Sequence, residues 1–194
     1  MKRIVSLVIV LAIILMVPIQ AFATETITAN DIASHITEMA DEPIAIVSST
    51  DPITGETTYT ATEVIVEDVS LEDVTAIGDS EMITPYGGFR YQFHTLGGGN
   101  LYYEIDDPFV LSSGEMLTLD VTNCVWAPET NTLHIGVYNF ALGKSYSVPA
   151  TGGSFVEERT YLNLPAGEYY VFVKNTGSRA LTTGYMTFTV SIFS

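Results

Sequence analysis

The chain has 194 residues, with 23 acidic side chains against 7 basic ones, a formal net charge of -16 and an isoelectric point near 4.2. Nucleic acids and anionic membrane surfaces are bound through Lys and Arg, so both are poor partners for so acidic a chain. Hydrophobic residues make up 47% of the sequence, which excludes a wholly disordered chain, and the single Cys excludes an intrachain disulfide framework and a Cys-rich zinc site.

Residues 1–23 have the pattern of a secretory signal peptide. A basic start at Lys2 and Arg3 precedes an apolar stretch, and Ala21-Phe22-Ala23 offers the small-x-small sequence of a cleavage site. The apolar stretch of about 14 residues is shorter than the roughly 20 that a membrane-spanning helix needs. We therefore expect cleavage after Ala23 and a secreted, extracellular protein that no longer contacts the membrane, with an uncleaved anchor as the alternative.

Residues 24–85 are predicted to be an acidic pro-segment or tether. They hold 14 acids, no Lys or Arg and one aromatic side chain, so like charges repel and bulky apolar residues are sparse. Some local structure is expected, because Asn30 can cap a short helix and a turn at 51–55 separates two segments that can pair as a hairpin. An isolated hairpin is marginal in water unless it docks on something larger, so we expect this segment to be partly disordered.

From Tyr86 onward the composition changes to 9 acids, 5 bases and 19 aromatic residues. Apolar and polar side chains alternate in short runs that end at turns rich in Gly, Pro and Asn. Clear runs lie at 89–93, 101–105, 117–121, 133–137, 169–173 and 186–192, and weaker ones at 145–148, 154–157 and 160–162. These eight or nine strands predict that residues 86–194 form an all-β fold, an antiparallel β-sandwich of jelly-roll or immunoglobulin-like type.

The last part of this region carries a family resemblance. Residues 162–192 contain the pattern L-x-x-G-x-Y-x-V-x-V, which is followed by a polar turn and a final strand. This resembles the end of bacterial pre-peptidase C-terminal domains, which are accessory β-sandwiches of secreted proteins. The layout of the whole chain also resembles small uncharacterised exported proteins of Gram-positive bacteria. The first resemblance implies a non-catalytic extracellular module.

Residues suited to catalysis are few. No G-x-S-x-G motif is present, and the three histidines are His35 in the predicted tether and His94 and His134 on predicted polar strand faces. Solvated or hydrogen-bonded histidines are the favoured interpretation. A zinc or catalytic pair formed by His94 and His134 is the alternative.

Acidic residues in turns raise the question of a calcium site, because Ca²⁺ prefers carboxylate and carbonyl oxygens. No calcium-binding loop motif is present, so solvated acids are the favoured interpretation and we expect neither a metal nor another cofactor. The candidates for the alternative are Glu104, Asp106, Asp107, Glu157 and Glu158.

Cys124 lies in the sequence NCVWAP, two positions before Trp126. Strict alternation places Cys124 on the same strand face as the polar residues Asp120 and Thr122, but a bulge near Asn123 would turn its side chain toward the core. A free Cys is most often a small buried apolar group, so a buried thiol is expected, with an intermolecular disulfide as the alternative.

Strict alternation places several aromatic residues on the face opposite the predicted core. Sugar rings stack on aromatic side chains, so a glycan-binding platform is one hypothesis. Strand ends, bulges or the tether could instead cover these rings, and this is the favoured interpretation because soluble proteins rarely leave a large apolar patch bare. The candidate contact residues are Tyr102, Trp126, Tyr138 and Tyr170.

Together these features predict a secreted, non-enzymatic binding or surface-interaction module. Its expected partner is an extracellular glycan, a cell-wall polymer or a protein. A structural component of an envelope or matrix is one alternative function, and an extracellular metal-assisted enzyme using His94, His134 and acids is another.

Overall fold

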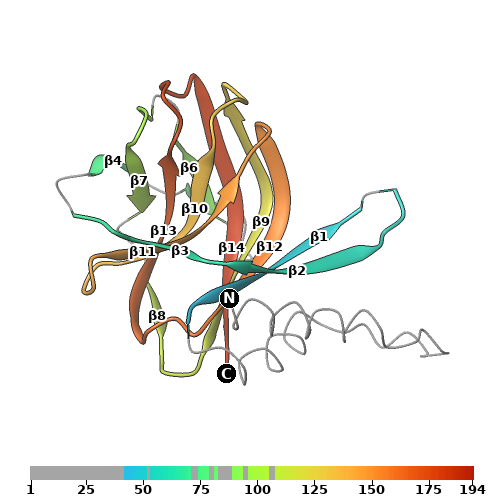
Figure 1. The fold of residues 1–194 in the computed structure, drawn as a ribbon, viewed down its shortest axis with the longest axis vertical. Coiled ribbons are helices and arrows are strands. Elements are labelled where there is room, and N and C mark those ends of the chain that lie inside the picture. The colour runs from blue at the N-terminus through green and yellow to red at the C-terminus, as the bar shows by residue number, and fades with distance from the viewer. Residues whose placement is uncertain are drawn as a thin grey trace, which may run out of the picture.

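The computed structural model describes residues 42–51, 53–70, 74–78, 81–82, 89–93, 96–104 and 108–194, with the backbone alone for 74–78, 81–82 and 101–104. The regular elements in these residues are β-strands, and they form two sheets packed face to face (Figure 1). The predicted all-β sandwich is therefore confirmed.

Sheet A has the strand order β2-β1-β12-β9-β14-β6-β5, and all of its neighbouring strands are antiparallel. The longest run of apolar alternation in the sequence, 186–192, lies in its strand β14. The strands are β1 (Ile44–Thr50), β2 (Thr57–Glu63), β5 (Glu81–Met82), β6 (Phe89–Gln92), β9 (Met116–Ala127), β12 (Ser154–Leu162) and β14 (Thr183–Phe193).

Sheet B has the order β3-β11-β10-β13-β7-β4, and β8 pairs with the end of β13. Its described pairings are antiparallel except that of β4 with β7, which is parallel. The strands are β3 (Ile65–Asp68), β4 (Val74–Gly78), β7 (Leu101–Glu104), β8 (Phe109–Leu111), β10 (Leu133–Asn139), β11 (Lys144–Ala150) and β13 (Gly167–Asn175).

The core lies between the sheets and is built from alternate residues of each strand, as the period of two predicts. Burying these side chains is the main stabilising contribution, at roughly 2 kcal/mol for each large one. Fully buried examples from both sheets are Leu117, Leu119, Leu133, Ile135, Val137, Val171, Val173, Met186 and Phe188.

The predicted start of the β-sandwich at Tyr86 is corrected, because residues 44–68 already belong to its sheets. The expected hairpin forms, but β1 pairs with β12 from Ile44↔Leu162 onward, and β3 pairs with β11. The chain passes from sheet A to sheet B at Val64, whose side chain is 5% exposed. This part of the predicted tether is thus built into both sheets of the sandwich.

The predicted signal peptide and the helix expected after Asn30 lie outside the described residues. Where the chain is described, it contains no helix with the length and apolar character needed to cross a membrane.

Candidate functional site

Trp126 does not lie on the surface, which corrects its predicted role as a contact residue. A bulge in β9 makes Asn123 pair with Thr187 but Val121 pair with Phe188, so the alternation shifts by one residue. Trp126 is consequently 2% exposed, and its Nε1 donates a hydrogen bond to the carbonyl oxygen of Asn131 at 2.9 Å. The bulge was predicted for Cys124, but the same shift also carries Trp126 into the core.

Tyr138 and Tyr170 are brought together but not left bare. They are directly opposite each other on β10 and β13, and Phe140 packs edge-on against both rings at 4.8 and 4.9 Å. Tyr138 is 2% exposed and donates a hydrogen bond to the carbonyl oxygen of Val69 at 3.2 Å.

Val69, Tyr138 and Phe172 form a small buried cluster on which Phe140 and Tyr170 are packed. Val69 comes from the segment predicted to be a tether, so this segment covers Tyr138, in agreement with the favoured interpretation that the rings are covered. Burial also raises the pKa of the Tyr138 and Tyr170 hydroxyls.

The fourth predicted contact residue, Tyr102, lies in β7. Its backbone pairs with Val173 of β13. Its side chain lies outside the described part of the structure, as does all of His94. The predicted aromatic platform therefore has no described pair of exposed rings to support it.

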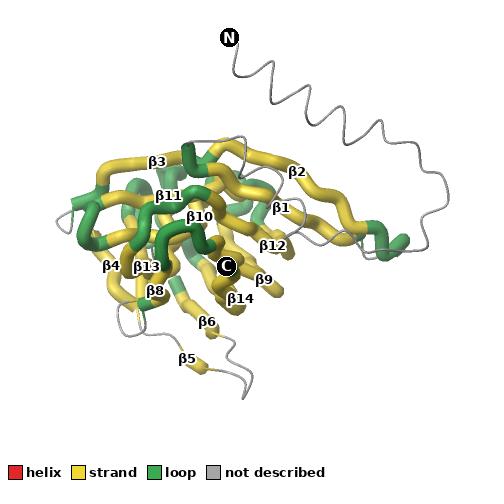
Figure 2. Tube along the Cα trace, turned by 90° about the horizontal axis from the view of Figure 1, so that it is seen from below, coloured by secondary structure: helices red, strands yellow, loops and turns green. Residues whose placement is uncertain are grey.

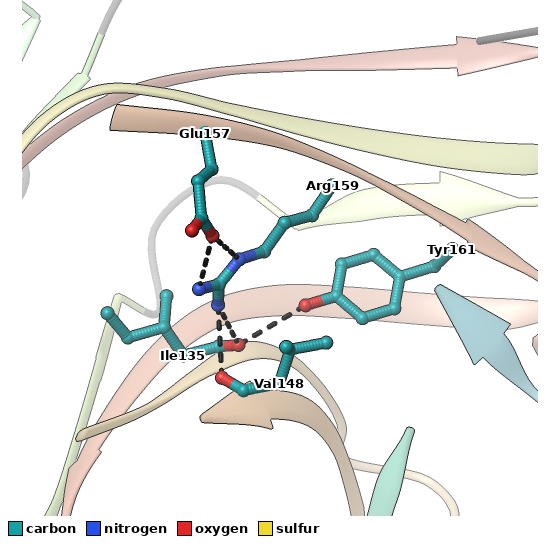
Figure 3. Close-up of polar contacts among 5 residues, drawn as sticks. All are labelled: Ile135, Val148, Glu157, Arg159 and Tyr161. Atoms are coloured by element: carbon teal, nitrogen blue, oxygen red, sulfur yellow. Dashed lines mark hydrogen bonds and ion pairs between the residues drawn. The ribbon is translucent and has the colours of Figure 1, made fainter. Parts of the chain in front are cut away.

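Arg159 is a buried side chain that the sequence analysis missed. It is 1% exposed and reaches from β12 across the core, where Nη1 donates hydrogen bonds to the carbonyl oxygens of Ile135 and Val148 at 3.1 and 3.0 Å (Figure 3). Nε and Nη2 donate to Oε2 of Glu157 at 3.2 and 2.9 Å. The guanidinium carbon also lies 4.7 Å from the ring centre of Phe155.

The contacts of Arg159 show that it links the two sheets and is not placed to bind an anion. Ile135 and Val148 belong to sheet B, and Tyr161 also donates a hydrogen bond to the Ile135 carbonyl, at 3.2 Å. Arg159 lies two positions before the buried Tyr161, so both side chains project from the same face of β12. This spacing is the one signal in the sequence that could have indicated that Arg159 points into the core.

Cys124 is fully buried, as predicted from the bulge. Burial raises the pKa of its thiol to about 12, although the nearby Arg159 acts in the opposite direction. The thiol therefore stays protonated at neutral pH and is neither a nucleophile nor positioned to form a disulfide with a second chain.

His134 is near two charged residues but not near a metal-binding set. Burial has the largest effect and lowers the pKa of His134. Glu67 raises this pKa and Lys174 lowers it further, both to a smaller extent. Lys174 forms an ion pair with Glu67 at 2.8 Å. In the described ranges, no three His, Cys, Asp or Glu side chains converge on a point where an ion could bind.

The two acids of β12 that were considered for calcium have different environments. Glu157 accepts the hydrogen bonds of Arg159, whereas Glu158 pairs in register with Asp120 of β9. Burial and the neighbouring Asp120 raise the pKa of Glu158, and burial raises that of Asp120. Asp106 and Asp107 lie outside the described residues, as does the side chain of Glu104.

The β1–β2 hairpin, residues 44–63, has an exposed outer part, and we call this hairpin the arm. β1 pairs with β12 only as far as Ser48, while its pairing with β2 continues to Thr50↔Thr57. The outer part of the arm therefore has only its own two strands, and it extends away from the sandwich (Figures 1 and 2).

The tip of the arm is held in a defined turn. Oδ1 of Asp51 accepts hydrogen bonds from the backbone amides of Ile53 and Thr54 at 2.7 and 3.1 Å, which lowers the pKa of this carboxyl. Ile53 is nevertheless 92% exposed. A shallow hollow beside the tip is lined by Ser49, Thr50, Asp51, Ile53, Glu56 and Thr58.

Comparison with protein-family models and with curated proteins found no match.

The arm thus combines exposure with backbone groups that have no described strand partner. β2 stands at the end of sheet A, where β1 is its only described partner. Its residues Thr57, Thr58, Thr60 and Glu63 are exposed. An edge of this kind can add another extended strand through its backbone groups.

Proposed function

We propose that this protein is an exported, non-catalytic interaction module that binds a partner macromolecule through the arm. Export rests on the signal-peptide pattern of residues 1–23. The observation that carries the binding role is the free edge of β2 on a hairpin that extends beyond its pairing with β12. The sandwich supplies a rigid base for that hairpin.

The chemistry of the arm favours an extended polypeptide as the partner. The exposed side chains of β2 are mainly threonines, with no exposed aromatic ring on which a sugar could stack. What the edge does offer is a row of backbone donors and acceptors, which a second extended chain matches. A glycan or cell-wall polymer is the alternative partner, and the experiment below separates the two.

The test is binding of the exported chain to isolated Gram-positive cell walls, measured by co-sedimentation. Thr60→Lys places a long charged side chain on the free edge, which natural proteins use to block strand addition. We expect this variant to lose about tenfold in affinity or more. The matched control is Val156→Lys, because Val156 is also exposed, at 63%, but lies on β12 away from the edge.

Two further results test the binding role proposed for the arm. Treatment of the walls with protease should remove binding if the partner is a polypeptide, and binding that survives this treatment would identify a glycan. Equal losses for Thr60→Lys and Val156→Lys, or an unchanged chain that binds neither the walls nor a second copy of itself, would contradict the role proposed for the arm.

A structural role in an envelope or matrix is the second candidate function. The same free edge favours it, because an edge that accepts a strand from another protein can also accept one from a copy of itself. We propose no enzymatic role.

A further inference from the structure

We propose that the strand added to the edge of β2 is the β2 strand of a second copy of this chain, paired antiparallel about a two-fold axis at Thr60. The inference rests on the role proposed for the arm and names its partner. Four features of the described residues lead to it: the edge, the free backbone groups, the register and the tip.

The β2 edge of sheet A is less protected against strand addition than the β3 edge of sheet B. In β3, Glu67 and Asp68 form ion pairs with Lys174 and Lys144 at 2.8 and 3.2 Å, so charges stand along that edge. β2 reads TTYTATE, with no Pro, no Lys and one charge in seven residues. Charges and prolines are the usual means of preventing edge pairing, and β2 has only Glu63 at one end.

The hydrogen bonding of the turn fixes which backbone groups are free. The amide of Asp51 donates to the carbonyl oxygen of Glu56 at 2.9 Å, and hydrogen-bonded pairs alternate along an antiparallel ladder. Thr58, Thr60 and Thr62 therefore bond toward β1. The amides and carbonyls of the intervening residues point outward, namely those of Thr57, Tyr59, Ala61 and Glu63.

A two-fold axis at Thr60 uses all of these outward groups. It places Thr57 opposite Glu63 and Tyr59 opposite Ala61 as hydrogen-bonded pairs, and Thr60 opposite its own copy as a non-hydrogen-bonded pair. All seven residues of β2 are then paired. The two Glu63 carboxylates lie at opposite ends, so no like charges face each other across the new ladder.

The tip of the arm also acquires a partner in this arrangement. Antiparallel pairing directs the tip of each arm toward the other copy's β2–β3 corner. Ile53 at the tip is 92% exposed and Val66 beyond the corner is 42% exposed. Two exposed apolar side chains are thereby brought to the same end of the interface, where each can shield the other from water.

The net charge of the chain determines how dimerisation depends on salt concentration. The full sequence carries a formal charge of -16, and removal of residues 1–23 takes away only the bases Lys2 and Arg3, so two exported copies repel at long range. Salt screens this repulsion beyond about 8 Å at physiological ionic strength but leaves the short-range strand pairing intact. Dimerisation should therefore strengthen as salt is raised.

The test is disulfide cross-linking of single-cysteine replacements in the full exported chain. In the proposed register the two Thr60 Cα atoms are about 4.5 Å apart, so Thr60→Cys should form a dimer on mild oxidation. Thr57→Cys is the matched control, because its two copies would be about 20 Å apart along the ladder and should stay monomeric. Cys124 does not interfere because it is fully buried.

Sedimentation equilibrium of the unchanged chain gives the second readout. We expect a monomer–dimer equilibrium that shifts toward dimer at about 0.5 M salt, and Thr60→Lys should abolish it. A Thr60→Cys protein that stays monomeric, together with an unchanged chain that is monomeric in both salts, would overturn the self-pairing. If Thr60→Lys still abolished binding to cell walls in that case, the arm would bind a different partner and the function proposed above would stand.

Discussion

Arg159 shows how a single charged residue can be accommodated inside a sandwich. An isolated buried charge is costly, but this guanidinium donates to two carbonyl oxygens of sheet B and to the carboxylate of Glu157. Glu157 keeps part of its side chain in solvent, at 27% exposure, so only one of the two charges is fully removed from water. The contacts tie β12 to β10 and β11 in addition to the apolar packing.

We predict that Arg159→Ala lowers the free energy of unfolding by about 3 kcal/mol. The substitution removes the hydrogen-bond donor of the Ile135 and Val148 carbonyls and creates a void in the core. Arg90→Ala is the matched control, since the exposed Arg90 stacks over Tyr185 at 5.2 Å and its loss should cost about 0.5 kcal/mol or less. Urea unfolding measures both values. Equal losses would show that Arg159 has no special role in joining the sheets.

At the scale of the strand, the β9–β12 pair has one feature that the sequence predicts, the burial of Cys124, and one that it does not, the pairing of Glu158 with Asp120. The burial of Cys124 was predicted because a free Cys is most often a small buried apolar group, and the bulge near Asn123 that would turn it inward is present. The pairing of Glu158 with Asp120 depends on a register between strands about 40 residues apart, which alternation within one strand does not reveal. This pairing places two carboxylates opposite each other on one face of sheet A.

Glu158 should therefore make stability depend on pH in a defined direction. Its pKa in the folded protein is raised by burial and by Asp120, so the folded state holds the proton to higher pH than the unfolded chain does. Stability is then favoured at acid pH and falls as pH rises through the shifted pKa.

We predict that Glu158→Gln raises the free energy of unfolding at pH 7 by about 0.5 kcal/mol, and that this gain disappears as the pH is lowered toward the ordinary pKa of 4.5. Thermal unfolding across this pH range is the measurement, with the exposed Glu168→Gln as the control. A gain that stayed constant down to acid pH would rule out the proposed electrostatic cause.

At the scale of the whole molecule, alternation predicted the sandwich but composition misplaced its beginning. The acids of residues 44–68 lie at exposed positions or pair with Lys144 and Lys174, while Ile46, Val64 and Val69 are buried. Composition counts these acids without regard to which positions are exposed, so the segment resembles a charged tether although its apolar residues are buried.

The candidate site shows the same limit of sequence reasoning. Tyr138 was correctly assigned to the outer parity of β10, but the backbone that covers it comes from Val69, 69 residues earlier in the chain. Such long-range covering cannot be read from the period of one strand. The exposed arm was partly foreseen, because the turn at 51–55 predicted its hairpin.

Hydrogen exchange of the exported chain in dilute solution tests the central claim most directly, namely that the arm is anchored in the sandwich and has a free outer edge. We predict that the amides of Ile46 and Ser48, which pair with β12, exchange as slowly as those of the core, while the outward amides of Tyr59 and Ala61 exchange much faster. Rapid exchange throughout residues 42–70, at the rate of an unstructured peptide, would contradict the account.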